Sequence, residues 1–148
     1  MSQDKEFQRK ASQSLQAAAE KALVTLRPFI GFGQLSALDA LCRGVEGIFY
    51  LERLINIATL IENMPVTFEQ RHDETDVAYL HYFSANSDWY ILEKDIDGGV
   101  SQAYGYAIID GDTRFAEFGY ISISDLVSRC VELDLHFTPI SLINLKKG

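Results

Sequence analysis

Residues 77–83, VAYLHYF, mark the point at which the period of the sequence changes from that of a helix to that of a strand. Val77, Tyr79, His81 and Phe83 lie on one side of an extended chain, and the residues between them lie on the other. Both sides are rich in apolar and aromatic residues, which is typical of a strand with two covered faces. This stretch therefore predicts a β-sheet that begins near the middle of the chain.

Four further strands are predicted after this stretch, at residues 88–95, 102–109, 114–121 and 132–137. Asp97-Gly98-Gly99 and Asp110-Gly111-Asp112 lie between them as hairpin turns, because Asp-Gly pairs tolerate the positive φ that tight hairpins need. Ser122 has the position of an N-terminal cap for a short helix before the last strand. Thr138-Pro139 has the pattern of a cap followed by proline, which predicts a terminal helical turn.

The first 65 residues have the spacing of helices. Apolar or alanine positions recur every three or four residues over about 5–26, which predicts one long amphipathic helix. Ser36 has the spacing of a cap for a second helical segment, and Gly44 and Gly47 either bend that segment or separate two helices. We therefore predict an α+β fold in which N-terminal helices (1–65) pack on an antiparallel β-meander of about five strands with a short inserted helix (66–148).

The composition fits one globular domain that spans residues 1–148. Cys42 and Cys130 are far apart in the sequence, so neither a disulfide framework nor a thiolate zinc site is expected. The polar N-terminus lacks the pattern of a secretory signal, and the most apolar segment, 47–64, carries three charges. We expect a cytoplasmic protein without a membrane span.

The net charge of −8 is distributed unevenly along the chain. Residues 1–65 contain seven basic and seven acidic residues, whereas residues 66–148 contain six basic and fourteen acidic residues. An acidic surface repels phosphate backbones, so no direct nucleic-acid binding is expected. A protein partner with a basic surface fits this charge better.

No motif typical of a catalytic, cofactor or metal site is found. An EF-hand loop counted from Asp95 has Gly99 at its fifth position and Tyr106 at its twelfth, where a bidentate glutamate is required. His72, His81 and His136 do not have a metal-binding spacing, and His81 is predicted to be packed and hydrogen-bonded. We therefore assign no catalytic residue, no metal and no cofactor.

The remaining candidate is an aromatic and acidic group centred on Trp89. Glu93 shares a strand face with Trp89 in a regular strand, and Glu117 lies on a later strand. If the two faces coincide, the two carboxylates approach each other as an acid/base pair. The candidate binding residues are Asp88, Trp89, Tyr90, Glu93, Asp95, Glu117, Tyr120 and His136.

Five segments resemble a small uncharacterised domain family: residues 79–83, 88–95, 103–107, 117–122 and 132–139. Members of this family occur on conjugative plasmids, integrative elements and phages, and as modules of large polyvalent proteins. The resemblance covers about residues 64–145. It implies a bacterial mobile genetic element as the setting, and it implies no particular activity.

These observations favour a non-enzymatic protein-interaction domain of a mobile element, with action against a host defence system as a fold-independent analogy. Two alternatives stay open. One is a small-ligand or acid/base enzyme module that uses Trp89, Glu93, Glu117 and His136, and the other is an acidic mimic of DNA. The electrically balanced N-terminal helices are the expected place for a homodimer.

Overall fold

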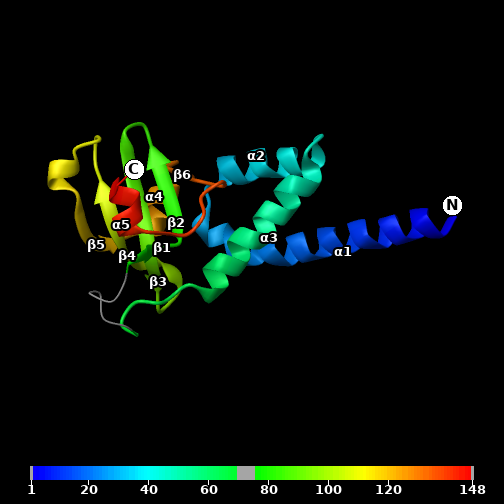
Figure 1. Cartoon of the computed structure of the whole chain (residues 1–148), viewed down its shortest axis with the longest axis horizontal. Helices are drawn as coiled ribbons and strands as arrows, with labels where there is room; N and C mark the ends of the chain where they lie inside the picture. The colour runs from blue at the N-terminus through cyan, green and yellow to red at the C-terminus, as the bar shows by residue number, and fades with distance from the viewer. Residues whose placement is uncertain (1, 70–75, 148) are drawn as a thin grey trace.

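The computed structural model describes residues 2–69 and 76–147, and its N-terminal half is helical (Figure 1). The elements are α1 (Ser2–Leu26), the 3-10 helix η1 (Arg27–Phe29), α2 (Phe32–Arg43) and α3 (Gly47–Asn63). Gly44 and Gly47 therefore separate two helices. Glycine is required at Gly47, because a Cβ there would lie 2.2 Å from the carbonyl oxygen of Cys42.

The predicted start of the second helix at Ser36 is wrong. Helix α2 begins at Phe32, directly after Gly31, whose carbonyl accepts the first intrahelical hydrogen bond from Leu35 N–H at 2.8 Å. The short η1 segment reverses the chain within three residues, so the new helix starts a turn earlier than its capping-box-like sequence indicates. Ser36 lies inside α2 and is exposed.

The second half forms an antiparallel sheet with the strand order β5-β4-β3-β2-β6. Its strands are β2 (Leu80–Ser84), β3 (Ser87–Asp95), β4 (Gly99–Ile108), β5 (Glu117–Ile121) and β6 (Glu132–Leu133). A separate ribbon pairs β1 (Val77–Ala78) with β7 (Ile140–Ser141). The predicted α+β class, with helices followed by an antiparallel sheet, is confirmed.

Two turn and cap predictions in this half are confirmed. Asp110 and Gly111 have φ values of 54° and 72°, and Asp112 N–H donates to Ile109 O at 3.1 Å, as in a tight hairpin turn. Ser122 caps α4 (Ile123–Ser128), since its hydroxyl oxygen accepts a hydrogen bond from Asp125 N–H at 3.2 Å. At both places the residues within a few positions of one another specify the local structure.

Several strand boundaries differ from the prediction. The stretch 77–83 divides at Tyr79, and the last sheet strand ends at Leu133 instead of residue 137. The chain turns there because the Asp134 carboxylate accepts a hydrogen bond from the backbone N–H of His136, two residues later, at 3.0 Å. Pro139 precedes strand β7 and does not begin a helix, and the terminal helix α5 (Leu142–Lys147) starts after β7. A 3-10 turn, η3 (Thr113–Phe115), precedes β5.

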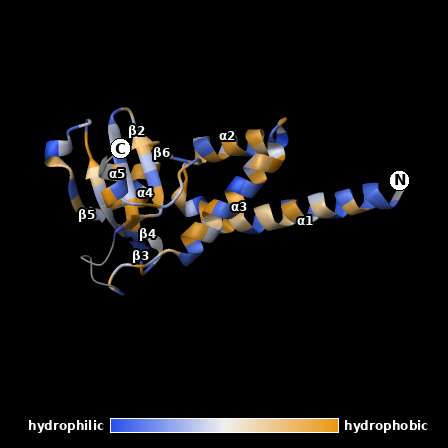
Figure 2. Ribbon diagram, in the orientation of Figure 1, coloured by the Kyte–Doolittle hydropathy of each residue, from blue (hydrophilic) through white to orange (hydrophobic). Residues whose placement is uncertain are grey.

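One hydrophobic core joins the helices to the sheet. Leu26 and Phe29 from the N-terminal half pack in the same cluster as Tyr82 and Ile91 from the sheet, and α4 adds Leu126. Figure 2 shows hydrophobic ribbon where α3 and the end of α1 approach the sheet, whereas the first turns of α1 are mainly hydrophilic. Among the described helices, none has the length and hydropathy required to cross a membrane.

Candidate functional site: the aromatic face of the sheet

The side of the sheet opposite the main core carries a row of aromatic rings, and we call this side the aromatic face. Cross-strand pairing places His81, Tyr90, Tyr106 and Phe118 side by side on four neighbouring strands. The rings of His81 and Tyr90 are stacked, with centroids 4.6 Å apart, and those of Tyr106 and Phe118 are 5.0 Å apart. Helix α5 contributes Leu142 to a small cluster that covers part of this face.

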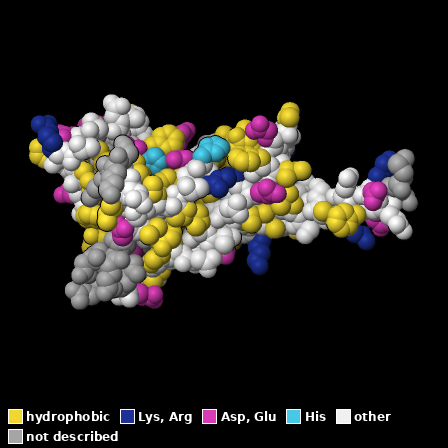
Figure 3. Space-filling view, viewed as in Figure 1, with side chains coloured by type: hydrophobic (Ala, Val, Ile, Leu, Met, Phe, Trp, Pro, Cys, Tyr) yellow, Lys and Arg dark blue, Asp and Glu magenta, His cyan; other side chains and the backbone are white. Residues whose placement is uncertain are grey.

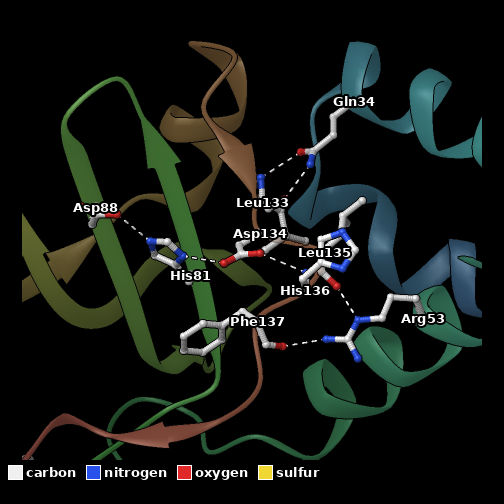
Figure 4. Close-up of polar contacts among 9 residues, drawn as sticks. All are labelled: Gln34, Arg53, His81, Asp88, Leu133, Asp134, Leu135, His136 and Phe137. Atoms are coloured by element: carbon white, nitrogen blue, oxygen red, sulfur yellow. Dashed lines mark hydrogen bonds and ion pairs between the residues drawn. The ribbon is translucent and has the colours of Figure 1, made fainter. Parts of the chain in front are cut away.

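His81 lies between two carboxylates on this face (Figure 4). Its Nδ1 is 2.9 Å from Asp134 Oδ2, and its Nε2 is 2.7 Å from Asp88 Oδ1. Each ring nitrogen thus has one carboxylate within hydrogen-bond distance. His81 is thus packed and hydrogen-bonded, as predicted, and its side chain is only 13% exposed.

The two carboxylates also affect the neighbouring tyrosine. Burial raises the pKa of Tyr90 above its ordinary value, and the charges of Asp88 and Asp134 raise it further. A tyrosine in this position stays protonated and keeps its hydroxyl as a donor. Both nitrogens of His81 contact side chains of the protein, so the cluster connects three chain segments: β2, β3 and the turn after β6.

The end of β6 and the segment after it are held by polar side chains of helices α2 and α3 (Figure 4). Gln34 of α2 bonds both backbone groups of Leu133, with Nε2 to O at 2.6 Å and Oε1 to N at 2.8 Å. Arg53 of α3 donates to Leu135 O through Nε and to Phe137 O at 2.7 Å. The helices therefore hold the same turn whose Asp134 side chain reaches His81.

Trp89, Glu93 and Glu117 do not converge. Trp89 pairs with Ala107, which pairs with Glu117, so these residues share the face that the helices cover. An irregularity in β3 between Ile91 and Glu93 shifts the register, and Glu93 comes to pair with Tyr104 on the aromatic face. The acid/base arrangement required Glu93 and Glu117 on one face, and the structure places them on opposite faces.

The remaining predicted residues have local roles or different neighbours. Asp95 is 7% exposed, and its carboxylate accepts the N–H groups of Asp97 and Gln102 at 3.0 Å each, which closes the β3–β4 turn. His136 lies in the turn after β6, whereas Trp89 lies on β3. The His136 ring stacks on Phe49 of α3 at a centroid distance of 6.1 Å. His72 is outside the described residues.

Glu93 is fully buried on the aromatic face, beside Tyr104. Burial raises the pKa of Tyr104, and the charge of Glu93 raises it further. Tyr104 is 5.9 Å from Tyr120, measured between ring centroids, and Tyr120 in turn is 6.1 Å from Phe68, which follows α3. Two residues of the predicted site, Glu93 and Tyr120, thus lie next to the same aromatic residue, Tyr104.

The most exposed part of the β half is β5 with the turn before it, and we call it the β5 surface: Asp110, Phe115, Glu117, Phe118 and Tyr120. Phe115 is 77% exposed, Phe118 45% and Tyr120 49%. Arg114 lies over the Phe115 ring at 5.6 Å and bonds Asp112 at 3.0 Å, an exposed pair that lowers the pKa of Asp112.

The exposed carboxylates of the described β half lie on different elements rather than in one row. They are Glu69, Asp97, Asp110, Glu117, Asp125 and Glu132. Figure 3 shows the acidic side chains of the viewed face at scattered positions. A DNA mimic requires a regular array of negative charges, and this distribution does not favour that alternative. In the described parts of the chain, no group of three or more metal-ligating side chains is suitably placed for an ion.

Sequence reasoning missed Gln34, Arg53 and Asp134 as structural residues of this region. The short motif Asp134-Leu135-His136 had a readable signal, since aspartate favours a turn closed by the amide two residues later. Gln34 and Arg53 gave no such signal, because their partners are backbone groups 99 and 82 positions later in the chain.

Searches with family models, among curated proteins and among solved structures found no match to this chain.

Proposed function

We propose that this chain is a protein-interaction domain whose β5 surface binds a partner protein with a basic surface. The observation that carries the proposal is the exposure of three large aromatic side chains, Phe115, Phe118 and Tyr120, in the half of the chain that holds the negative charge. Aromatic residues are enriched at protein interfaces and dominate their binding energy. Asp110 and Glu117 are also exposed in this part of the chain, Asp110 in the turn before β5 and Glu117 on the opposite side of β5 from Phe118 and Tyr120.

The two kinds of side chain have different tasks in this proposal. Exposed carboxylates accelerate the encounter with a basic partner and make association sensitive to salt, while the rings supply most of the affinity after contact. The setting is a bacterial mobile genetic element, supported by the family resemblance of residues 64–145, with a host defence protein as one class of partner. The balanced charge of the helical half supports a homodimer through α1–α3.

Site-specific photocrosslinking in the bacterial host tests the β5 surface. Benzoylphenylalanine in place of Phe118 should capture one dominant protein, and the same label in place of Val24, which is 71% exposed on α1, should not capture it. The captured protein should have a basic surface, and capture should weaken in high salt.

A pair of charge variants separates steering from unspecific attraction. Asp110→Asn/Glu117→Lys removes one steering charge and reverses another, while asparagine keeps the left-handed conformation at position 110, and it should reduce capture by about fivefold. Glu46→Gln/Glu52→Lys makes the same change in net charge on exposed positions of the helical half and should leave capture unchanged. Equal loss in both double variants, or capture that is indifferent to salt, contradicts the proposal.

A further inference from the structure

A groove of about 550 Å³ opens between α1, α2 and α3. Its walls are apolar side chains from all three helices, and charged side chains stand among them. The lining includes Leu23 of α1, Leu35 and Cys42 of α2, and Leu51 of α3, with Glu20 beside them. The groove thus has the form of a vacant place for one more helix beside three packed ones.

Helix α1 extends beyond the rest of the molecule in the direction of its N-terminus (Figure 1). Every residue of 3–14 is exposed, and Phe7 is 75% exposed. An unpacked helical segment of this length is only marginally stable in water, and most helical stability in proteins comes from packing an apolar face. Packing against another surface would therefore stabilise this segment as a helix.

The apolar stripe of α1 continues from the packed part into the projecting part. Ala22 is 7% exposed and belongs to the core, Leu15 is half-buried, and Ala11 and Phe7 continue the same spacing outward. A stripe that is already an interface at one end is thus extended by turns in which all side chains of residues 3–14 are exposed. The projecting segment is mainly hydrophilic but carries a narrow apolar stripe, Phe7 and Ala11, that can pack against the apolar side chains of the groove.

Charge points to a second copy of this chain as the occupant. The helical half has seven basic and seven acidic residues, so two such halves meet without net repulsion, whereas two β halves repel each other. Spacings of four, seven and four place Lys5, Arg9, Gln16 and Glu20 on one side of α1, and all four are exposed. Gln16 and Glu20 line the groove.

An antiparallel arrangement of two α1 helices uses this pattern twice. When the N-terminal turns of one copy enter the groove of the other, Lys5 comes opposite the second copy's Glu20, and symmetry repeats the pair. The face of α1 that carries Phe7 lies on the other side of the helix from Lys5 and thus points to the wall formed by α2. That wall includes Leu38 and Cys42.

We infer that the groove between α1, α2 and α3 receives the N-terminal turns of α1 from a second copy, which forms a two-fold symmetric, antiparallel dimer. This inference rests on the proposed homodimer and gives it a site and a geometry. It does not depend on the partner of the β5 surface.

A disulfide trap tests the geometry with a native thiol. In a Cys130→Ser background, Phe7→Cys should form a covalent dimer through Cys42 of the other copy when oxidised with copper–phenanthroline. Peptide mapping should identify a link between the introduced thiol and Cys42, and mixed isotope labels should show that it joins two chains. Val24→Cys in the same background, with its thiol on an exposed position of the same helix, should give no such link.

A charge swap provides a second, independent measurement by sedimentation equilibrium. Glu20→Lys should weaken the dimer by about tenfold, because two exposed ion pairs become repulsions. Lys5→Glu combined with Glu20→Lys should restore the wild-type dissociation constant. Both positions are exposed, so neither variant disturbs the core.

The outcomes separate the dimer from its geometry. A wild-type chain that remains monomeric at hundreds of micromolar overturns both the homodimer and the groove. A dimer that neither forms the disulfide nor responds to the charge swap overturns the groove alone, and so does a monomer that binds a helix of another protein there. Loss of photocrosslinking at Phe118, with the disulfide trap intact, affects only the β5 surface.

Discussion

Gln34 and Leu133 form a two-way hydrogen-bonded pair between the helical half and the sheet. The amide side chain of Gln34 donates to Leu133 O at 2.6 Å and accepts from Leu133 N–H at 2.8 Å. The side chain thus takes the place of a neighbouring strand at the edge of β6, whose two residues pair only with β2 on the other side. A single residue of α2 completes the hydrogen bonding of the sheet edge.

Gln34→Ala should destabilise the chain by about 2 kcal/mol, because it leaves two partly buried backbone groups without their partner. Gln34→Glu should cost at least as much as Gln34→Ala, since the carboxylate keeps the acceptor for Leu133 N–H but sets a charged oxygen against Leu133 O in a partly buried position. Urea unfolding monitored by circular dichroism measures both. Ser101→Thr, at an exposed position of β4, is the control and should change the free energy of unfolding by less than about 0.5 kcal/mol.

The two carboxylates that hold His81 should contribute unequally to stability. Asp134→Ala removes the contact to His81 Nδ1 and also the acceptor of His136 N–H, and it should cost about 3 kcal/mol. Asp88→Ala removes one contact, at a side chain that is 35% exposed, and should cost about half as much. Urea unfolding monitored by circular dichroism measures both variants, and equal losses would contradict this ranking.

The parts of the fold that sequence predicts well are those in which the cause is local. Asp110-Gly111 specifies its turn through backbone preference, and Ser122 caps its helix through one short hydrogen bond. Alternation in residues 80–83 follows from the period of an extended chain, so the faces of β2 agree with the prediction. Each of these features depends on residues within a few positions of one another.

The parts that sequence does not predict depend on packing between distant segments. The register shift after Ile91 reverses the face of Glu93, and no local preference in β3 reports it. Arg53 is bound by carbonyls that come near it only when the helices and the sheet are assembled. Of the predicted binding residues, Asp88, Tyr90, Glu93 and Tyr120 share the aromatic face, while Trp89 and Glu117 lie on the other.

Stability should fall above pH 10 because of Tyr82. Its side chain is fully buried and donates to Phe29 O, and burial raises its pKa well above the ordinary value. In the unfolded chain the hydroxyl ionises near pH 10, so above that pH the unfolded state binds fewer protons than the folded state and gains free energy from ionisation. The loss from this residue should reach about 1.4 kcal/mol at pH 11.

Urea unfolding at pH 9, 10 and 11 checks this expectation. Tyr82→Phe should be less stable at pH 9, because Phe29 O loses its donor, but its stability should fall less steeply with pH. Tyr90 and Tyr104, whose pKa values are also raised by burial, should account for the slope that remains. Parallel pH profiles of wild type and Tyr82→Phe would show that Tyr82 is not the source of the alkaline loss.

Cys130→Gly should stabilise the chain, although it removes a side chain. Cys130 follows α4 with a φ of 64°, in a C-terminal motif where Val131 N–H donates to Leu126 O at 3.0 Å and Cys130 N–H donates to Val127 O at 3.1 Å. This left-handed conformation suits glycine and strains any residue with a Cβ, and the exposed thiol contributes little to packing. The relief of strain exceeds the greater freedom of glycine in the unfolded chain, so the expected gain is about 0.5 to 1 kcal/mol. Cys130→Ala keeps the Cβ and should be neutral, so the Tm of Cys130→Gly should be higher than that of Cys130→Ala. A lower Tm for Cys130→Gly would mean that the greater freedom of glycine in the unfolded chain outweighs the strain of the Cβ.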